Sequence, residues 1–357
     1  MADAGEAVMQ RLLAEAAQLW PETPPSSIKC ARKFSRPYST VYRLLLEYAP
    51  GQIPATPSAL FAKIFRPSQK NLQQQQKYLD RLQTEFEVAA HLHEQLRGQQ
   101  AVGIVRPLAY YPDLLALVTE EAPGQGLAEL IVAACKHWAL RNTLHQAVLH
   151  CHRAGVALAV MQTATAQTER CEAEEIFEYI HVRLQRLRES EAVPFSEADY
   201  KRVRAFLEQA LSKVPRIQLA QCGCHSDYAP FNVLADKERV TILDFSMYKI
   251  GSCYNDVTYF YHRIEGYLHK PIFNPAAIRT VQSAFLEGYN QALARARDPI
   301  ENDLMFRVMW MKHVINNYSA IMRNRVGGGR RESWPVRLFH QHVFRRYNDW
   351  LVRMSRG

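Results

Sequence analysis

Hydrophobic and polar residues alternate in short runs through the first third of the chain, and a period of two is typical of β-strands. Residues 60–65 alternate around a single lysine, Lys63. Residues 104–108 and 114–119 form further short hydrophobic runs. The pattern therefore predicts a strand-rich region, with Lys63 on one of the strands.

Two segments of the same region show helical spacing instead. Residues 6–19 carry Ala, Leu and Met at that spacing, and the proline-rich residues 21–25 end it. From about Ser68 to Arg97 the hydrophobic residues recur on one face, and Gly98 follows. The members of that face are Leu79, Leu82, Phe86, Ala89 and Leu92. We expect a leading helix, a linker and one long helix among the strands.

The composition is that of a globular protein. The chain has 357 residues, of which 48% are hydrophobic and 22% are charged. No uninterrupted apolar run approaches the ~18 residues that cross a bilayer, and residues 1–20 lack a signal-peptide pattern. The seven cysteines are odd in number and scattered, which suits reduced thiols. A cytosolic location is expected.

A polar segment followed by a hairpin carries the candidate chemistry. Residues 224–232 read CHSDYAPFN, and the hydrophobic run 240–243 leads into Asp244. Short hydrophobic runs flank the polar turn at 236–239. This arrangement predicts a hairpin that carries polar groups at its open end.

These residue types suit the transfer of a phosphate from a nucleotide to a hydroxyl group. Asp227 would accept the proton of the hydroxyl, and His225 would hold the loop. Asn232 and Asp244 would offer oxygen ligands to Mg²⁺, which prefers oxygen donors. The alternative is that the Asp and Asn side chains only cap turns. Four such residues in this order beside a strand favour phosphate transfer.

At these residues the chain resembles the aminoglycoside phosphotransferase and choline kinase-like family, which has a protein-kinase-like fold. Residues 251–257 look like that family's G-x-x-x-x-D-L segment, which implies that Asp256 is a structural anchor of the catalytic loop. Residues 117–127 are similar to the family's hinge. The resemblance implies that adenine contacts backbone groups near Glu120 and Ala122.

The resemblance also assigns a role to Lys63, which looks like the lysine of the third kinase strand. It implies that Lys63 contacts nucleotide phosphates and pairs with a glutamate of the following helix. We expect Glu85, and Glu87 is the alternative because each residue turns a helix by roughly 100°. The loop over the phosphates is expected at residues 34–44, where Ser39 and Thr40 would donate hydrogen bonds. This loop contains no glycine.

The resemblance implies an α+β fold with the two lobes of a protein kinase. Residues 1–26 would form an N-terminal helix and linker, and residues 27–121 a nucleotide-binding lobe with a mainly antiparallel sheet and one long helix. Residues 122–357 would form a mostly helical lobe. That lobe would contain the catalytic loop at 222–257 and acceptor-binding helices at 258–357.

The spacing of two aspartates and the distribution of charge narrow the class of the phosphate acceptor. Only eleven residues separate Asp244 from Asp256, which leaves no room for an activation segment, so a protein substrate is not expected. The whole net charge of +9 lies in residues 258–357, which hold 16 Lys and Arg against 7 Asp and Glu. The clustered arginines are Arg323, Arg325, Arg330 and Arg331 in a glycine-rich loop, and Arg345, Arg346, Arg353 and Arg356 on a final helix.

Four interpretations of these arginines stay open. They form a solvated helix face, they bind an anionic acceptor, or they dock on an anionic lipid surface with neighbouring aromatic residues. Nucleic acid is the fourth, but no nucleic-acid motif accompanies the basic residues. Cationic aminoglycosides would call for carboxylates here, so the antibiotic-kinase interpretation ranks lower.

The sequence therefore predicts a Mg²⁺-dependent phosphotransferase. It would move the γ-phosphate of ATP or GTP to a hydroxyl of a small molecule or saccharide. The rival from another class is a non-catalytic nucleotide-binding or scaffold protein. That rival would be favoured by the loss of Lys63, Asp227, Asn232 or Asp244, and all four are present.

Overall fold

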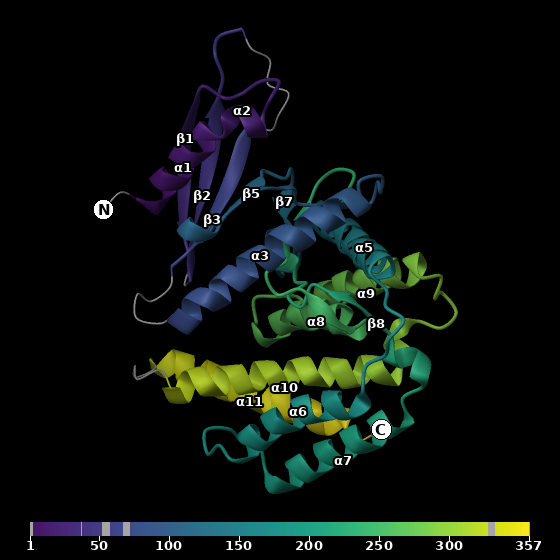
Figure 1. The fold of residues 1–357 in the computed structure, drawn as a ribbon. Coiled ribbons are helices and arrows are strands. Elements are labelled where there is room, and N and C mark those ends of the chain that lie inside the picture. The colour runs from purple at the N-terminus through teal and green to yellow at the C-terminus, as the bar shows by residue number, and fades with distance from the viewer. Residues whose placement is uncertain (1–2, 37, 52–57, 67–71, 328–332, 357) are drawn as a thin grey trace. The chain divides into compact units, whose positions relative to one another are not determined.

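The computed structural model describes residues 3–36, 38–51, 58–66, 72–327 and 333–356. It divides into two compact units, each of which is described by itself (Figure 1). The first comprises Met1–Gly126 with Asn232–Tyr248, and the second comprises Leu127–Phe231 with Lys249–Gly357. The first carries antiparallel strands and the second is mostly helical. The predicted α+β class, with a sheet-bearing N-terminal region and a helical C-terminal region, is confirmed.

The first unit is built on a five-stranded antiparallel sheet with the order β1-β2-β3-β6-β5. Its strands are β1 (Ser27–Ser35), β2 (Ser39–Glu47), β3 (Ala59–Phe65), β5 (Pro107–Tyr111) and β6 (Ala116–Glu120). Alternate residues of β2 and β3, among them Leu44, Leu60 and Ala62, are buried in one core. The alternation of hydrophobic and polar residues that predicts the strands therefore also determines which face of the sheet packs in the core.

The leading helix belongs to this core. It comprises α1 (Ala4–Ala14) and the short α2 (Ala16–Leu19), and Asp3 caps α1 by accepting from the Gly5 amide. Val8, Leu12 and Trp20 are buried in the same cluster as the sheet residues. The sequence pattern set residues 1–26 apart from the sheet-bearing region. In the structure the helix packs on the sheet, because its apolar face needs a partner surface.

A second, four-stranded sheet in the same unit has the order β4-β10-β9-β7. It consists of β4 (Val102–Ile104), β7 (Gln125–Gly126), β9 (Val233–Ala235) and β10 (Val240–Ile242). The run 104–108, predicted as one strand, is divided between sheets. Val102–Ile104 pairs in parallel with β10, whereas Pro107 begins β5 and pairs with β6. Proline has no N–H for a strand ladder, which suits it to the first position of a strand.

The long predicted helix is α3 (Leu72–Gln95), and its expected start at Ser68 lies outside the described residues. Tyr78 and Leu82 pack in a small cluster with Phe65, Leu115 and Leu117. The Phe65 and Tyr78 rings stack with centroids 4.6 Å apart. This packing determines the rotation of α3 against the sheet.

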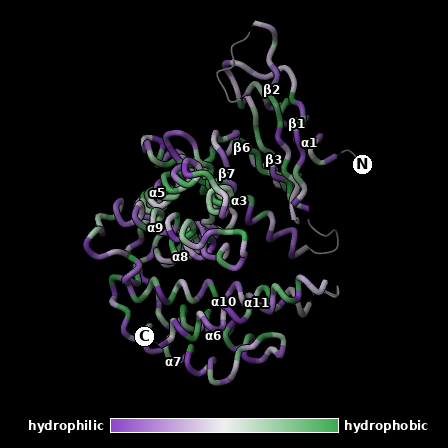
Figure 2. The backbone as a smooth tube through the Cα atoms, turned by 180° about the vertical axis from the view of Figure 1, so that it is seen from behind, coloured by the Kyte–Doolittle hydropathy of each residue, from purple (hydrophilic) through white to green (hydrophobic). Residues whose placement is uncertain are grey.

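The second unit is a helical assembly with a two-stranded sheet. Its elements are α4 (Leu127–Ala134), α5 (Arg141–Ala164), α6 (Ala173–Arg188), α7 (Glu197–Lys213), β8 (Gln221–Cys224), β11 (Lys249–Ser252), α8 (Tyr254–Glu265), α9 (Pro275–Ala292), α10 (Leu304–Gly327) and α11 (Trp334–Met354). Hydrophilic and hydrophobic residues alternate along α10 and α11 (Figure 2). On α11, Val343, Phe344, Tyr347 and Leu351 are buried.

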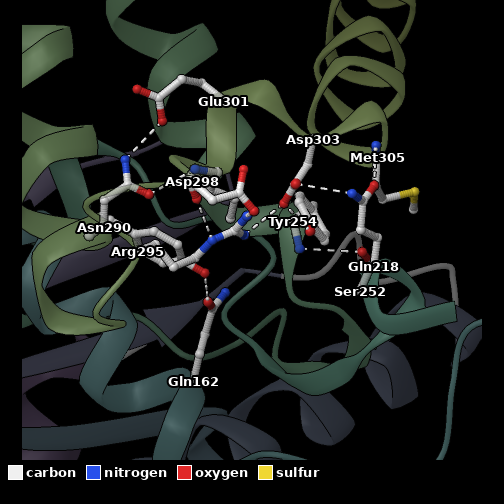
Figure 3. A network of polar contacts seen from close by, with 12 residues as sticks. Gln162, Gln218, Ser252, Tyr254, Asn290, Arg295, Asp298, Glu301, Asp303 and Met305 are labelled. Atoms are coloured by element: carbon white, nitrogen blue, oxygen red, sulfur yellow. Dashed lines mark hydrogen bonds and ion pairs between the residues drawn. The ribbon is translucent and has the colours of Figure 1, made fainter. Parts of the chain in front are cut away.

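A polar network fixes the start of α8 (Figure 3). Asp303 accepts hydrogen bonds from the Tyr254 hydroxyl and the Gln218 amide, and it pairs with Arg295 at 2.6 Å. The pairing with Asp303 and burial act in opposite directions, and the pairing wins, so the pKa of Arg295 is raised. The network ties the start of α8 to Gln218, which follows α7, and to Arg295 and Asp303, which follow α9.

Glycines allow α5 and α9 to cross at close range. A Cβ atom on Gly155 would lie 2.0 Å from the Phe285 carbonyl oxygen, and one on Gly288 would lie 2.0 Å from the His152 carbonyl oxygen. Both obstacles are backbone atoms, so a side chain cannot be accommodated by a rotamer change. The helices must separate to accept any larger residue.

Gly288→Ala is therefore expected to lower the free energy of unfolding by about 3 kcal/mol, at the upper end of typical overpacking costs. The measurement is urea-induced unfolding followed by circular dichroism. Gly98→Ala is the matched control, because its Cβ would have no neighbour within 4 Å. Equal stability of the two variants would contradict the close crossing.

Candidate active site

Lys63 on β3 lies between two carboxylates in the first unit. Its Nζ is 2.9 Å from Glu85 Oε2 on α3 and 2.9 Å from Asp244 Oδ1 after β10. Glu85 is buried, whereas Glu87 accepts from the Gln83 side chain along the exposed side of α3. The structure therefore pairs Lys63 with Glu85 and leaves Glu87 on another face of the helix.

The charges in this cluster are strongly coupled. Burial favours the neutral form of Lys63, but the Glu85 and Asp244 carboxylates outweigh it and raise the pKa of the lysine above its ordinary value. Burial raises the pKa of Glu85, with a smaller contribution from Asp244. Lys63 is therefore a fixed positive charge, held by two acidic groups from distant parts of the chain.

Asn232 and Asp244 lie at the same end of the β9–β10 hairpin. Asn232 immediately precedes β9 and Asp244 follows β10 by two residues, and Val233 pairs with Ile242. The Asn232 carbonyl accepts from the Leu243 amide at 2.9 Å. Asp244 has a φ of 63°, and its Oδ1 also accepts from Ser246 Oγ at 2.7 Å. The hairpin thus brings two oxygen-bearing side chains to one edge.

This donor set fits Mg²⁺ bound together with a phosphate ligand. Carboxylate and amide oxygens are hard donors, and Mg²⁺ usually takes one or two carboxylates, with water and substrate phosphates completing its shell. Among the described residues no group of three or more His, Cys, Asp or Glu could hold a metal alone. The remaining ligands would therefore come from outside the protein.

The polar loop 224–231 belongs to the second unit and is held by Asp256. This carboxylate accepts from the His225 amide at 2.6 Å and from the Ser226 amide at 2.9 Å. Asp256 is fully buried, and burial raises its pKa above the ordinary value. Ser226 has a φ of 63°, a left-handed conformation that costs roughly 1–2 kcal/mol outside glycine. The hydrogen bonds that the His225 and Ser226 amides donate to Asp256 hold this conformation.

Asp227 follows this strained residue, and its Oδ1 accepts from the Tyr259 hydroxyl at 2.9 Å. Its own amide donates to His225 Nδ1 at 3.3 Å, so the buried histidine supports the loop from within. Burial raises the pKa of Tyr259, and Asp227 adds to the effect, so the phenol stays a donor. Tyr259 was missed in the sequence. The available signal was its place three residues after Asp256, on a neighbouring face of the same helix.

The residues predicted to hold the nucleotide, Ser39, Thr40, Glu120 and Ala122, lie in the first unit. Ser39 and Thr40 are buried at the start of β2, and the Ser39 carbonyl accepts from the Arg36 amide at 2.9 Å. Pro37, within the predicted loop, lies outside the described residues. Glu120 pairs with Arg106 at 2.8 Å. Glu120 and Ala122 line a cavity of about 260 Å³.

The basic C-terminal region is only partly described. Arg323 is exposed on α10, whereas Arg330 and Arg331 lie outside the described residues and the side chain of Arg325 is not described. Arg345, Arg346 and Arg353 are exposed on α11, opposite its buried apolar face. Arg356, expected on the same helix, is exposed just beyond its end at Met354. Among the residues that the structure describes, no helix has the length and apolar character needed to cross a membrane.

Comparison with protein families identifies the chain's relatives. The model of the phosphotransferase enzyme family matches residues 53–300. A search among curated proteins finds no significant match.

Solved structures share the fold at low sequence identity. A putative aminoglycoside phosphotransferase from Ralstonia eutropha is 12% identical with a TM-score of 0.62, and the match covers 98% of each chain. A choline kinase from Cryptosporidium parvum is 10% identical with a TM-score of 0.55, over 98% of this chain and 95% of that one. A glucosamine kinase is 15% identical with a TM-score of 0.52, over 97% and 98%.

Proposed function

Because this chain belongs to the phosphotransferase enzyme family, we propose that it moves the γ-phosphate of ATP or GTP to a hydroxyl group of a small molecule or saccharide. The family is one of small-molecule phosphotransferases, and the structural neighbours named as choline, glucosamine and aminoglycoside kinases are consistent with that class. The observation that carries the proposal is the contact of Lys63 with both Glu85 and Asp244.

The first unit supplies the groups that would hold the nucleotide. Lys63, kept protonated by its two carboxylates, would bind nucleotide phosphates. Ser39 and Thr40 would donate to phosphate from the start of β2. Backbone groups near Glu120 and Ala122 would bind the adenine or guanine base. Cations and hydroxyl donors in these places stabilise the charge that phosphoryl transfer spreads over phosphate oxygens.

Asn232 and Asp244 would hold Mg²⁺ at the open end of the β9–β10 hairpin. The ion supplies charge neutralisation on the phosphates when it is bound. The Asp244 carboxylate lies 2.9 Å from Lys63 Nζ. A nucleotide phosphate bound here would therefore be close to two positive charges, those of Lys63 and Mg²⁺. The arrangement favours a polyphosphate ligand over a single carboxylate or sulfate.

Asp227 would accept the proton of the attacking hydroxyl. The Tyr259 hydroxyl holds one oxygen of its carboxylate, which orients the second oxygen and restricts the rotation of the side chain. His225 and Asp256 are positioning residues, since they touch the loop's amide groups. The hydroxyl of the acceptor would thus approach an Asp227 carboxylate whose orientation is restricted.

The proposal is tested by a phosphate-transfer screen of the purified protein. ATP and GTP are each supplied with Mg²⁺, and the acceptors are amino sugars, phosphosugars, choline-like alcohols and glycolipids. We expect acceptor-dependent release of nucleoside diphosphate that disappears when Mg²⁺ is omitted. Stabilisation by nucleotide without turnover on any acceptor would favour the non-catalytic nucleotide-binding rival. Exclusive use of aminoglycosides would favour the antibiotic-kinase interpretation.

A further inference from the structure

A cavity of about 230 Å³ opens beside the polar loop within the helical unit. One wall is the end of that loop, Pro230 and Phe231. The others come from α4, from α8 and the turn after it, and from α10 and α11. The residues that matter for its chemistry are Phe231, Arg263, Tyr267, Lys270, Phe339 and Tyr347.

The charged lining of this cavity is basic. Arg263 and Lys270 are its cationic members, and none of its lining residues in the described part of the chain is a carboxylate. His269 also lines it, but burial, Arg346 and nearby histidines lower the pKa of His269 to about 4, so the ring is neutral near pH 7. The cavity therefore favours an anionic ligand.

A second cavity in the same unit shows a different balance. It measures about 210 Å³ and is lined by Lys249 and Lys312 together with Glu172 and Glu175. Its two basic and two acidic residues cancel in formal charge. The excess of positive charge therefore distinguishes the cavity beside the polar loop from this second cavity.

Arg263 is held at a defined place in relation to Asp227. Its guanidinium carbon lies 5.4 Å from the centre of the Phe231 ring and 5.9 Å from the centre of the Tyr259 ring. Tyr259 is one helical turn earlier on α8, and its hydroxyl donates to Asp227. Residues four apart on a helix have Cβ atoms ~5–6 Å from each other. Tyr259 thus lies next to both the Arg263 guanidinium and the Asp227 carboxylate, so a ligand group at Arg263 lies near a hydroxyl at Asp227.

The remaining lining suits the body of such a ligand. Phe231 and Phe339 are 46% and 40% exposed, which is unusual for large aromatic side chains. Tyr267 and Tyr347 add further ring surface to the cavity. Binding sites for small molecules combine apolar and aromatic walls with a few polar groups that fix orientation. Here Arg263 is the cationic group that lies over the ring of Phe231 in the polar loop.

We propose that this cavity binds the acidic group of the acceptor, and that the acceptor is a sugar bearing a carboxylate or a phosphate. Arg263 binds the acidic group through two parallel, charge-assisted hydrogen bonds, and the planar guanidinium is suited to this bidentate geometry. Phe231 and Phe339 contact the sugar ring. The inference rests on the proposed function, since it names the substrate class of that reaction.

The test compares matched acidic and neutral sugars. The pairs are glucuronate with glucose, galacturonate with galactose, and glucose 6-phosphate with glucose. Two quantities are measured for each sugar: its effect on thermal unfolding, and kcat/KM for release of nucleoside diphosphate. The variants are Arg263→Gln, Arg263→Lys and the control Arg279→Gln, an exposed arginine of α9 that lines none of the cavities described above.

We expect the wild type to prefer the acidic member of at least one pair. Arg263→Gln should weaken binding and use of that member by about 10- to 100-fold, the loss typical of one charged hydrogen bond. Arg263→Lys should retain part of the preference, and Arg279→Gln should retain all of it. The preference should also shrink with added salt, because Arg263 is exposed.

Three outcomes would overturn the inference. They are a preference for the neutral sugars, an acid preference that Arg263→Gln does not change, and the absence of any response to an acidic sugar. Transfer to neutral sugars alone would leave the proposed phosphotransfer intact while removing this inference. Conversely, acid binding that depends on Arg263 without turnover would retain the binding site and remove the proposed transfer.

Discussion

Replacing Asp227 by Asn is expected to lower the rate of phosphate transfer by about 10²- to 10⁴-fold, the usual cost of losing a general base. Asparagine keeps the size and the contact with the Tyr259 hydroxyl but cannot accept the proton. Nucleotide binding should change little, because Lys63 and Asp244 are untouched. The measurements are kcat for the best acceptor and the dissociation constant of the nucleotide.

Two further variants sharpen this prediction. Tyr259→Phe keeps the Asp227 carboxylate and removes the donor that holds it, so we expect a loss of about tenfold, in line with one hydrogen bond to a charged group. Asp298→Asn changes an exposed carboxylate elsewhere in the helical unit and should leave the rate unchanged. Transfer at the wild-type rate by the Asp227→Asn variant would remove Asp227 from the mechanism.

Asp244→Ala is expected to abolish the stabilisation of the protein by nucleotide with Mg²⁺. A ligand at ~100 times its dissociation constant stabilises the folded state by about 2.7 kcal/mol, which corresponds to a rise of several degrees in the wild-type Tm. The variant lacks the carboxylate that would bind the ion. Thermal unfolding is followed with nucleotide alone, with Mg²⁺ alone and with both.

The comparison must separate ligand binding from the stability of the free protein. Asp244 also pairs with Lys63, so the Tm of each variant is first measured without ligand. Asp236→Asn, in the turn of the same hairpin, is the control and should keep the full response. A Mg²⁺-dependent rise in Tm that survives in Asp244→Ala would place the ion elsewhere.

The pairing of Lys63 illustrates how far local patterns extend. Alternation around Lys63 and the periodicity of the following helix both predict their elements, because each depends on residues close in sequence. The choice between Glu85 and Glu87 depends on how far the helix is rotated about its axis. Packing of Tyr78 and Leu82 against the sheet side decides that rotation. The structure then places Glu85 against Lys63.

Strand pairing shows the same limit. The hydrophobic run 104–108 has the composition of one strand, yet its two ends pair with partners in different sheets. The partner of β4 is β10, more than a hundred residues later in the chain. No local pattern contains that partner. The sequence pattern therefore predicted one continuous strand, and this prediction was wrong.

By itself, the sequence determined the α+β class, the order of the chemical groups and the family resemblance, since periodicity and motif spacing are local properties of a chain. Only the tertiary structure decided which groups meet. Lys63 reaches Asp244 across 181 positions, and Tyr259 reaches Asp227 across 32. The basic cavity around Arg263 likewise needs α8, α10 and α11 packed together. Such contacts depend on how apolar faces bury against each other, which many distant residues decide jointly.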